Sequence, residues 1–390
     1  MNKQKILKYT IIVVAIILLI WKVVDFNRNN IDEQQFIYLA KSWMHGKLFF
    51  ITVPGGWGDT ALFNGHHYWP LGPLPALLAI PFLVFYKNLQ QHDLSILFNI
   101  VNIILLFRIA KKSTGKNTDS LWLTFAFVFA TAYLYIAAKP WSWYFAQVVG
   151  VTFLLLAIQE FMDKKRYALI GLWIGFAIAT RLNLVLATIF FVLQILFEKD
   201  NKSLKIKNFL ALSLPIFVIA LGLGFYNFAR FGSFFELGYS YQLLYNEPAE
   251  NIKYGIWSLI HFPANIYYFL LRGPDPVFLP GTKVLTSPYL KPDIWGMSII
   301  LTSPIFLWIF SKRPKSKDVT FAWITIIIML IAILGYYGIG VRQYGYRYAI
   351  DFYPFLYLIL CYFFRDKIPL PFKIIAIAAA ALNIYMIPLV

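Results

Sequence analysis

The sequence predicts an all-α membrane protein that crosses the bilayer many times. Of its 390 residues, 60% are hydrophobic and 14% are charged, whereas a soluble domain is about half apolar and about a quarter charged. Apolar stretches recur from one end of the chain to the other, so a soluble domain with a single anchor does not fit. Basic residues gather in short segments between these stretches, which is typical of multi-pass proteins.

About eleven stretches are apolar enough to be membrane spans, for which roughly 20 residues suffice, or fewer where the helix is short. They are residues 7–24, 95–110, 120–138, 143–161, 167–180, 182–197, 209–226, 294–310, 319–337, 348–364 and 372–389. The first is followed by WKVVDF and no small-residue cleavage site, so we interpret it as a span and not as a signal peptide.

Residues 167–197 form one long apolar run that Arg181 interrupts. Cationic clusters flank the run at both ends. A single helix of this length would be too long for a bilayer. It would also put one of the two cationic clusters on each side of the membrane, whereas such clusters stay on the cytoplasmic side. We therefore expect a tight hairpin of two short helices.

The layout places 21 of the 35 lysine and arginine residues on one side of the membrane. Because positively charged loops stay in the cytoplasm, we expect a cytoplasmic N-terminus in the plasma (inner) membrane and an extracytoplasmic segment at 25–94. This orientation explains the net charge of +17 and argues against a nucleic-acid partner. The single cysteine, Cys361, excludes an intrachain disulfide.

Two long segments, 25–94 and 227–293, are expected outside, and loops are where function concentrates. Residues 72–86 (GPLPALLAIPFLVFY) hold three prolines, and we expect them to lie in the outer interface or to be re-entrant. Residues 251–272 mix polar and aromatic side chains, which suits an interfacial helix.

The stretch NNIDEQQFIYLAKSWMHG begins the first outer segment. Apolar residues at helical spacing, including Phe36, Leu39 and Trp43, predict a short amphipathic helix over 31–45. Asn30 is a candidate N-cap, with Glu33 completing a capping-box pattern, and Gly46 is a natural stop. Capping accounts well for Glu33 and less well for Asp32, which we expect on the membrane-facing side, where an unused carboxylate is costly.

Four stretches in chain order carry a resemblance to a known family. The first is the Asp32–Glu33 pair followed by Tyr38, Ala40 and Gly46, directly after the first span. The others are GDTALFNGHHYWPLGPLPALLAIPF (58–82), YNFARFGSFFELGYSYQ (226–242) and RQYGYRYAIDFYPFL (342–356). Together they resemble the GT-C membrane glycosyltransferases, which include the protein O-mannosyltransferases and the aminoarabinose transferases of glycosyltransferase family 39 and its relatives.

The resemblance implies a GT-C-type fold in one transmembrane domain, 1–390, with about 11 spans and interfacial helices in its outer loops. It implies that the first outer loop, the second outer loop (137–147) and the loop 227–293 form a catalytic cavity. The enzyme would move a sugar, with inversion, from a polyprenyl-phosphate carrier to a hydroxyl of a lipid, glycan or protein acceptor. Asp32 would be the base and Glu33 would orient it or the sugar.

The sequence departs from the family pattern in the second outer loop. Residues 137–147, AAKPWSWYFAQ, contain no Asp or Glu, although the family usually has an acid there. Whether a divalent cation is a cofactor therefore stays open.

A lipid-phosphate leaving group needs cations near the membrane edge. The candidate phosphate ligands are Lys139, Arg181, Arg342 and Arg347. Two of them have structural alternatives, since Arg347 stands four residues before Asp351 and Arg181 could cap the hairpin. Arg230 and Arg272 could instead reach out to the membrane surface.

Candidate sugar or acceptor ligands lie in the same motifs and loops. They are Asp59, His66, His67, Tyr68, His261, Tyr346 and Asp351. His66 and His67 adjoin the Asn64–Gly65 turn, and a plain turn explains them as well as ligand contact does. No acid or second histidine stands at helical spacing from them, so no metal site is assigned there.

Three other functions fit a polytopic chain. A polymerase or ligase of lipid-linked glycans would not call for an acid pair after the first span. A transporter or flippase would carry ionisable residues in mid-span and related halves, neither of which the sequence shows. A noncatalytic scaffold related to the enzymes is the third alternative, and the acid missing from 137–147 keeps it open.

Overall fold

The computed structural model describes residues 11, 14–15, 18–19, 21–22, 33–52, 58–244, 247–311 and 314–390. The predicted span 7–24 falls largely, and Asp32 wholly, outside the described residues. The chain divides into two compact units. Unit 1 comprises Met1–Leu105 and Ile136–Ala249, and unit 2 comprises Leu106–Tyr135 and Glu250–Val390.

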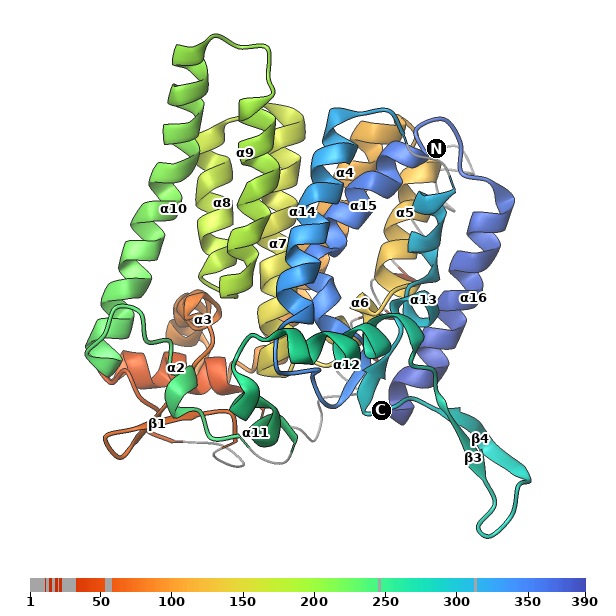
Figure 1. Ribbon diagram of the computed structural model, residues 1–390, viewed down its shortest axis with the longest axis horizontal. Helices are drawn as coiled ribbons and strands as arrows, with labels where there is room; N and C mark the ends of the chain where they lie inside the picture. Colours follow the sequence, from red (N-terminus) through yellow and green to blue (C-terminus); the bar gives the residue numbers. More distant parts are fainter. Residues whose placement is uncertain are drawn as a thin grey trace. The chain divides into compact units, whose positions relative to one another are not determined.

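Within the described residues, five helical segments are long and apolar enough to cross a membrane. They are α4 (Gln91–Thr114), α7 (Ser142–Asp163), α10 (Lys202–Phe231), α14 (Lys317–Leu334), and α16 (Leu370–Met386) with its 3₁₀ extension η8 (Ile387–Leu389). They contain or closely match the predicted spans 95–110, 143–161, 209–226, 319–337 and 372–389. The chain is thus built as an integral membrane protein, with helices as the main element (Figure 1).

The predicted hairpin over 167–197 is confirmed in unit 1. Helix α8 (Tyr167–Ile178) is followed by the 3₁₀ helix η1 (Leu182–Ala187) and by α9 (Thr188–Leu196). Helix α8 packs against both α7 and α10 (Figure 1). Glycine permits this approach, because a Cβ on Gly171 would lie 2.1 Å from the carbonyl oxygen of Leu212.

Two predicted spans are wrong as continuous helices. Residues 120–138 divide into α5 (Asn117–Phe129) and α6 (Tyr133–Ala138). Residues 294–310 contain strand β5 (Trp295–Met297), α13 (Ile299–Thr302) and the 3₁₀ helix η6 (Pro304–Phe310). Residues 348–364 are helical, in η7 (Arg347–Phe352) and α15 (Tyr353–Phe363).

Side chains far away in the sequence make the break after α5 tolerable. The Asn383 amide donates to the carbonyls of Phe129, Thr131 and Thr302 at 3.0, 3.2 and 3.3 Å. The Ser303 hydroxyl accepts the N–H of Ala132 at 3.0 Å. Buried backbone groups need such partners, and here side chains supply what a continuous helix would have supplied.

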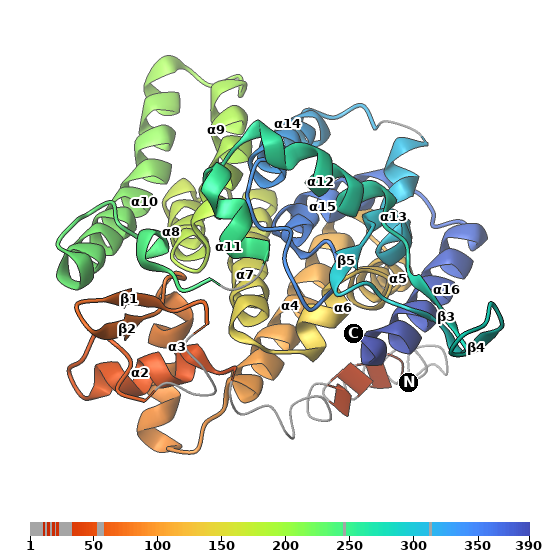
Figure 2. The ribbon, with the colours of Figure 1, turned by 60° about the horizontal axis from the view of Figure 1, so that its bottom comes forward.

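The first outer segment folds into α2 (Gln35–Met44), the hairpin β1 (Ala61–Phe63) and β2 (His66–Tyr68), and α3 (Leu74–Phe85) (Figure 2). Helix α2 buries Phe36 and Leu39, as its periodicity predicts, and Gly46 follows it at φ +70°. The predicted start at residue 31 is wrong, because the helix begins at Gln35 and no acid lies in its first turn. Asn30 is outside the described residues.

The second outer segment contributes mainly to unit 2. Its elements are α11 (Glu247–Asn251), η3 (Ile252–Tyr254), η4 (Leu259–His261), α12 (Phe262–Ile266) and the π-helix η5 (Tyr267–Leu271), then β3 (Asp275–Phe278) and β4 (Leu285–Lys291). Residues 259–271 form the short apolar helix expected within 251–272. Strands β3 and β4 form an antiparallel hairpin, and β5 pairs in parallel with β6 (Gln343–Gly345).

Candidate active site

The acid-bearing turn before α2 is held by its own helix. Glu33 is partly buried, and its Oε2 accepts a hydrogen bond from Nε2 of Gln35 at 3.1 Å. Asp32 lies outside the described residues, so its role as base stays a prediction.

Ser142, the first residue of α7, closes the N-terminus of α2 from the second outer loop. Its Oγ accepts the backbone N–H of Gln35 at 2.9 Å and donates to Oε1 of Gln35 at 2.5 Å. The carbonyl oxygen of Glu33 lies 3.2 Å from the same hydroxyl. The first N–H groups of a helix lack partners within the helix, so Ser142 acts as its cap in place of the capping box expected at Glu33.

Gln91 links the same turn to the start of α4. Its backbone N–H donates to Oε1 of Gln34 at 2.9 Å, and its Nε2 donates to the carbonyl of Pro140 at 2.5 Å. Gln91 and Ser142 are fully buried, so each of these bonds is shielded from water. Three segments of unit 1 thus meet at Glu33: the start of α2, the start of α4 and the turn before α7.

Two hollows lie beside this polar network. One is lined by Glu33, Gln34, Gln90, Gln91, His92, Pro140 and Trp141. The other, of about 360 Å³, is lined by Gln34, Ile37, Tyr38, Lys41, Tyr86, Asn88, Leu89 and Gln90. Gln34 and Gln90 line both hollows. Amide and phenol groups dominate the larger one, and such groups both donate to and accept from hydroxyls.

The predicted cations of unit 1 are both buried. Lys139 is 8% exposed and places Nζ 3.9 Å from the centroid of the Trp141 ring, a cation–π contact beside the polar network. Arg181 lies in the turn between α8 and η1, as expected. That turn contacts the start of α3, where the N–H of Leu74 donates to the carbonyl of Ala179 at 3.0 Å.

The β1–β2 hairpin carries three predicted ligands, His66, His67 and Tyr68, and a fourth, Asp59, lies two residues before it. Asn64 and Gly65, both at positive φ, make its turn, so the Asn-Gly signal correctly predicts a hairpin. The His66 ring stacks on Phe49 at 3.9 Å. His67 places Nδ1 2.8 Å from Oγ1 of Thr60, and burial lowers the pKa of its imidazole.

Asp59 and Tyr68 join the hairpin to the segment after α10. The Asp59 side chain accepts a hydrogen bond from Nε2 of Gln242 at 3.3 Å. Ala61 forms an isolated antiparallel β-bridge with Gln242. Tyr68 packs edge-on against Phe231 in a cluster with Ala61. Burial raises the pKa of Tyr68, which marks its phenol as part of the packing. Two of the four motif stretches, 58–82 and 226–242, therefore fold against each other.

Arg230, expected to reach the surface, is instead 5% exposed. Its Nη1 donates to the carbonyl of Trp69 at 2.8 Å and its Nη2 to Oδ1 of Asn227 at 2.7 Å. The guanidinium stacks at 4.0 Å on the ring of Tyr226. The surface interpretation of Arg230 is wrong because the main chain after β2 needs its donors.

In unit 2 the motif 342–356 presents Arg342 and buries its neighbours. Arg342 is exposed, at φ 52°, and its carbonyl accepts from the Tyr135 hydroxyl at 2.6 Å. Arg347 donates to the Tyr348 hydroxyl at 3.2 Å and lies 4.6 Å from that ring. Asp351 is 2% exposed. The choice for Arg347 between an ion pair with Asp351 and phosphate contact stays a prediction.

Tyr346 and His261 hold the short apolar helix in place. The Tyr346 hydroxyl donates to Oδ1 of Asn265 at 2.8 Å, and burial raises the pKa of this phenol. The His261 Nε2 lies 3.0 Å from the carbonyl of Gly255. Asn265 also donates to the carbonyls of Leu334 and Tyr336 at 3.0 and 2.9 Å. Both predicted ligands are thus 7% exposed or less and engaged in structural bonds.

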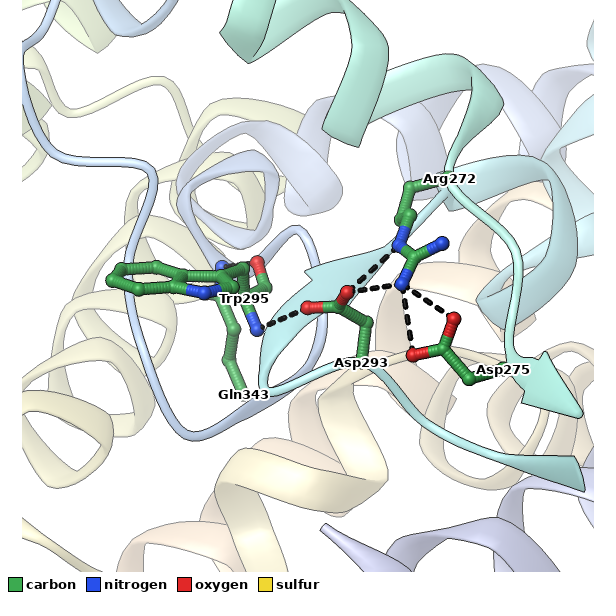
Figure 3. A network of polar contacts seen from close by, with 5 residues as sticks. All are labelled: Arg272, Asp275, Asp293, Trp295 and Gln343. Atoms are coloured by element: carbon green, nitrogen blue, oxygen red, sulfur yellow. Dashed lines mark hydrogen bonds and ion pairs between the residues drawn. The ribbon is translucent and has the colours of Figure 1, made fainter. Parts of the chain in front are cut away.

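Arg272 is held by two carboxylates and does not reach freely to the surface. It donates through Nε to Asp293 at 2.8 Å and through Nη2 to both oxygens of Asp275 at 2.7 and 2.8 Å (Figure 3). The hydrogen bonds to Asp293 and Asp275 outweigh the opposing effect of burial and raise the pKa of Arg272. Among the described residues, no group of three or more His, Cys, Asp or Glu is placed to hold a metal ion.

Two solved structures of ArnT from Cupriavidus metallidurans have the fold of this chain. One, bound to undecaprenyl phosphate, has a TM-score of 0.59 at 13% identity, and the apo form has 0.58 at 14%. Each match covers 96% of this chain and 63% of the ArnT chain, so this chain spans less than two thirds of that protein. The fold is of the GT-C type. No protein-family model matches the sequence, and no curated protein is similar to it at a significant level.

On this GT-C fold, the predicted ligands form separate groups. Glu33 and Lys139 adjoin the network around Ser142, whereas Asp59, His67 and Tyr68 belong to the hairpin and its packing. Sequence reasoning missed the neutral residues that fix the network, namely Gln34, Gln35, Gln91 and Ser142. Their signal is the position of polar residues at the ends of apolar stretches, in QQF after the acid pair and in LQQHD before α4.

Proposed function

We propose that the protein is a membrane glycosyltransferase that moves a sugar from a polyprenyl-phosphate carrier to an acceptor hydroxyl at the outer membrane face. The GT-C fold supports this, since the ArnT structure that shares it is described as bound to undecaprenyl phosphate. The observation that carries the proposal in this chain is the anchoring of the acid-bearing turn at Glu33 by Ser142 and Gln91. A catalytic carboxylate must be held in place, and here buried side chains hold the main chain next to the acid pair.

In the proposed reaction Asp32 takes the proton of the acceptor hydroxyl as that oxygen attacks the anomeric carbon. Displacement proceeds with inversion, and the phosphate of the carrier leaves with the bonding electron pair. Glu33 orients the base or the sugar. Lys139, Arg181, Arg342 and Arg347 are the candidate cations for the phosphate charge.

The larger hollow beside the network would suit the sugar or the acceptor, since amides and phenols line it. The remaining sugar-ligand candidates are Asp59, His66, His67, Tyr68, His261, Tyr346 and Asp351. Of these, His66 is exposed, while Tyr68, His261, Tyr346 and Asp351 are buried. His66 is therefore the best placed of this set to meet a ligand without rearrangement.

The test is transfer of radiolabelled sugar from a panel of polyprenyl-phosphate sugars by the protein in nanodiscs. Asp32→Asn should lower the rate by about 10²–10⁴-fold, the usual contribution of a general base. Asp366→Asn is the matched control, because Asp366 is exposed in the segment between the predicted spans 348–364 and 372–389, and it should retain transfer.

Transfer that survives in Asp32→Asn would move the base to Glu33 or Asp59. A wild-type protein that binds the carriers yet transfers no sugar would contradict the enzyme assignment and favour the scaffold. The panel also identifies the donor sugar.

A further inference from the structure

The hairpin β3–β4 of unit 2 exposes large apolar side chains on both of its faces. Phe278 pairs with Leu285 across the strands, and they are 38% and 49% exposed. The next pair toward the turn, Leu279 and Val284, is 43% and 59% exposed. Successive residues of a strand point to opposite faces, so neither face of this hairpin is covered by the described residues of the chain.

Such a hairpin is not expected to be stable in water without help. Two strands alone are marginal, and an exposed apolar surface of this kind marks a site of interaction. The structure fixes its base through Arg272, which binds Asp275 at the start of β3 and Asp293 just after β4 (Figure 3). The hairpin β3–β4 is therefore held in a defined position, with its turn directed away from the helices of unit 2 (Figure 1).

The apolar surface of the hairpin continues onto a membrane-spanning helix. The hydroxyl of Tyr385 in α16 donates to the carbonyl of Pro288 in β4 at 2.8 Å. Along α16, Ile374, Ile377 and Ile384 are 56%, 52% and 44% exposed, as expected for side chains that face lipid. The hairpin adjoins the C-terminal end of this helix in both views (Figures 1 and 2).

The charge of the hairpin is positive. Residues 276–291 contain Lys283 and Lys291 and no acid. The acids at the base, Asp275 and Asp293, are both occupied by Arg272. A cationic apolar element matches an anionic lipid surface, because the negative headgroups attract lysine side chains.

We propose that β3–β4 is a membrane-binding arm whose end inserts into the headgroup layer of an anionic phospholipid bilayer beside α16. The depth is limited by the backbone, because the outer edges of a two-stranded hairpin carry unpaired N–H and C=O groups that hydrocarbon does not tolerate. Leu279 and Val284, the pair nearest the turn, therefore reach the upper acyl chains while the strands stay at headgroup level, with Tyr289 and Tyr385 in the interface.

The experiment places one environment-sensitive fluorophore on the arm. The full chain with Cys361→Ala and Val284→Cys is labelled with NBD and reconstituted into vesicles of phosphatidylcholine and phosphatidylglycerol in equal parts. Quenching is measured with nitroxide lipids labelled at the headgroup, at a shallow acyl position and at a deep one, and with aqueous iodide on both sides. Ile377→Cys on α16 and the exposed loop position Lys199→Cys are the lipid and water references.

The label at 284 should be quenched most by the headgroup and shallow nitroxides. Iodide should quench it at least about threefold less than the label at 199, as expected for a buried interfacial group. The additional substitutions Lys283→Glu and Lys291→Glu should weaken the quenching by nitroxide lipids and restore much of the quenching by iodide in anionic vesicles. If iodide quenches the label at 284 as much as the label at 199, and no nitroxide lipid quenches it, the proposal is overturned and the surface is left to a protein partner. If the deep nitroxide quenches the label at 284 most strongly, the interfacial depth is overturned.

Discussion

The guanidinium of Arg230 donates to the main-chain carbonyl of Trp69 at 2.8 Å across 161 residues of sequence. The bond joins the end of α10 to the chain just after the β1–β2 hairpin. A second donor engages Asn227, and the Tyr226 ring covers one face of the guanidinium. Arg230 is thus a structural cation, and this accounts for an arginine that the charge bias of the outer side does not predict.

Replacing Arg230 by lysine should destabilise unit 1 by about 1–3 kcal/mol. One ammonium group cannot reproduce the planar fork that serves Trp69 and Asn227, so a buried acceptor is left without its donor. Thermal unfolding of the protein in detergent measures the change. Arg108→Lys is the control, since the Arg108 side chain is exposed, and it should shift stability by about 0.5 kcal/mol or less. Equal effects of the two substitutions would contradict the structural role.

Removing the Ser142 hydroxyl should weaken both stability and sugar transfer. Ser142→Ala takes the cap from α2, at a cost of about 0.5–2 kcal/mol, and loosens the turn at Glu33. Thr152→Val is the matched control, because the Thr152 hydroxyl bonds only the Val148 carbonyl of its own helix in the described contacts. If both variants unfold and transfer alike, Ser142 does not hold the turn.

Gly72 should not tolerate a methyl group. A Cβ there would meet the carbonyl oxygen of Ala179 at 2.3 Å and its carbon at 2.7 Å, both in the backbone of the α8–η1 turn. Gly72→Ala should therefore separate α3 from that turn and reduce the yield of monodisperse protein. Gly222→Ala in α10 meets nothing within 4 Å and should be neutral or stabilising by up to about 1 kcal/mol. Normal yield of Gly72→Ala would show that the contact is looser than described.

The stability of unit 1 should fall as pH decreases below 6.5, the ordinary pKa of histidine, in part through His67. Burial lowers the pKa of His67 in the folded state, so the unfolded chain binds the proton more readily. The contribution is complete above pH 6.5 and is lost as pH falls through the lowered pKa. Unfolding temperatures on both sides of pH 6.5 should converge between wild type and His67→Gln at low pH. An unchanged pH dependence in His67→Gln would contradict this role of the imidazole.

Asp293→Asn should free the base of the β3–β4 hairpin. The change removes the charge that Arg272 pairs with, and breaking a partly buried pair leaves the remaining groups poorly satisfied. Limited proteolysis between residues 274 and 294 should become faster. Glu250→Gln, in an exposed pair with Lys253, is the control and should not change the cleavage pattern. Unchanged cleavage in Asp293→Asn would mean that Asp275 alone secures the arm.

Hydrophobic periodicity predicts the elements whose stability is local. It gives α2 with its buried Phe36 and Leu39, the α7 span and the short pair of helices on either side of Arg181. The Asn64–Gly65 dipeptide likewise predicts its turn. In each case the signal and the structure lie within the same few residues.

Hydropathy does not predict where an apolar stretch breaks. Residues 120–138 and 294–310 are uncharged throughout, yet both are interrupted. At the break in 120–138, the amide of Asn383 and the hydroxyl of Ser303 bond the freed backbone groups. Both side chains come from distant parts of the sequence. The start of α2 is misplaced for the same reason, since its cap is Ser142 and not a nearby side chain.

The candidate site was only partly readable from the sequence. Charged residues and histidines are rare in apolar chains, so they are the first candidates selected from the sequence. This criterion finds Glu33 and Lys139, which lie beside the polar network. It does not find Gln91 or Ser142, whose neutral side chains act through main-chain bonds. The same emphasis selects Tyr346 and His261, whose side chains also hold a helix in place.

The bond between Gln35 and Ser142 also orders events during synthesis. The two residues are 107 positions apart, so the N-terminus of α2 waits for its partner until translation and membrane insertion have passed the start of α7. Long-range contacts form late because the intervening loop must close first. The turn at Glu33 therefore reaches its final arrangement only after α4 and α7 are in place.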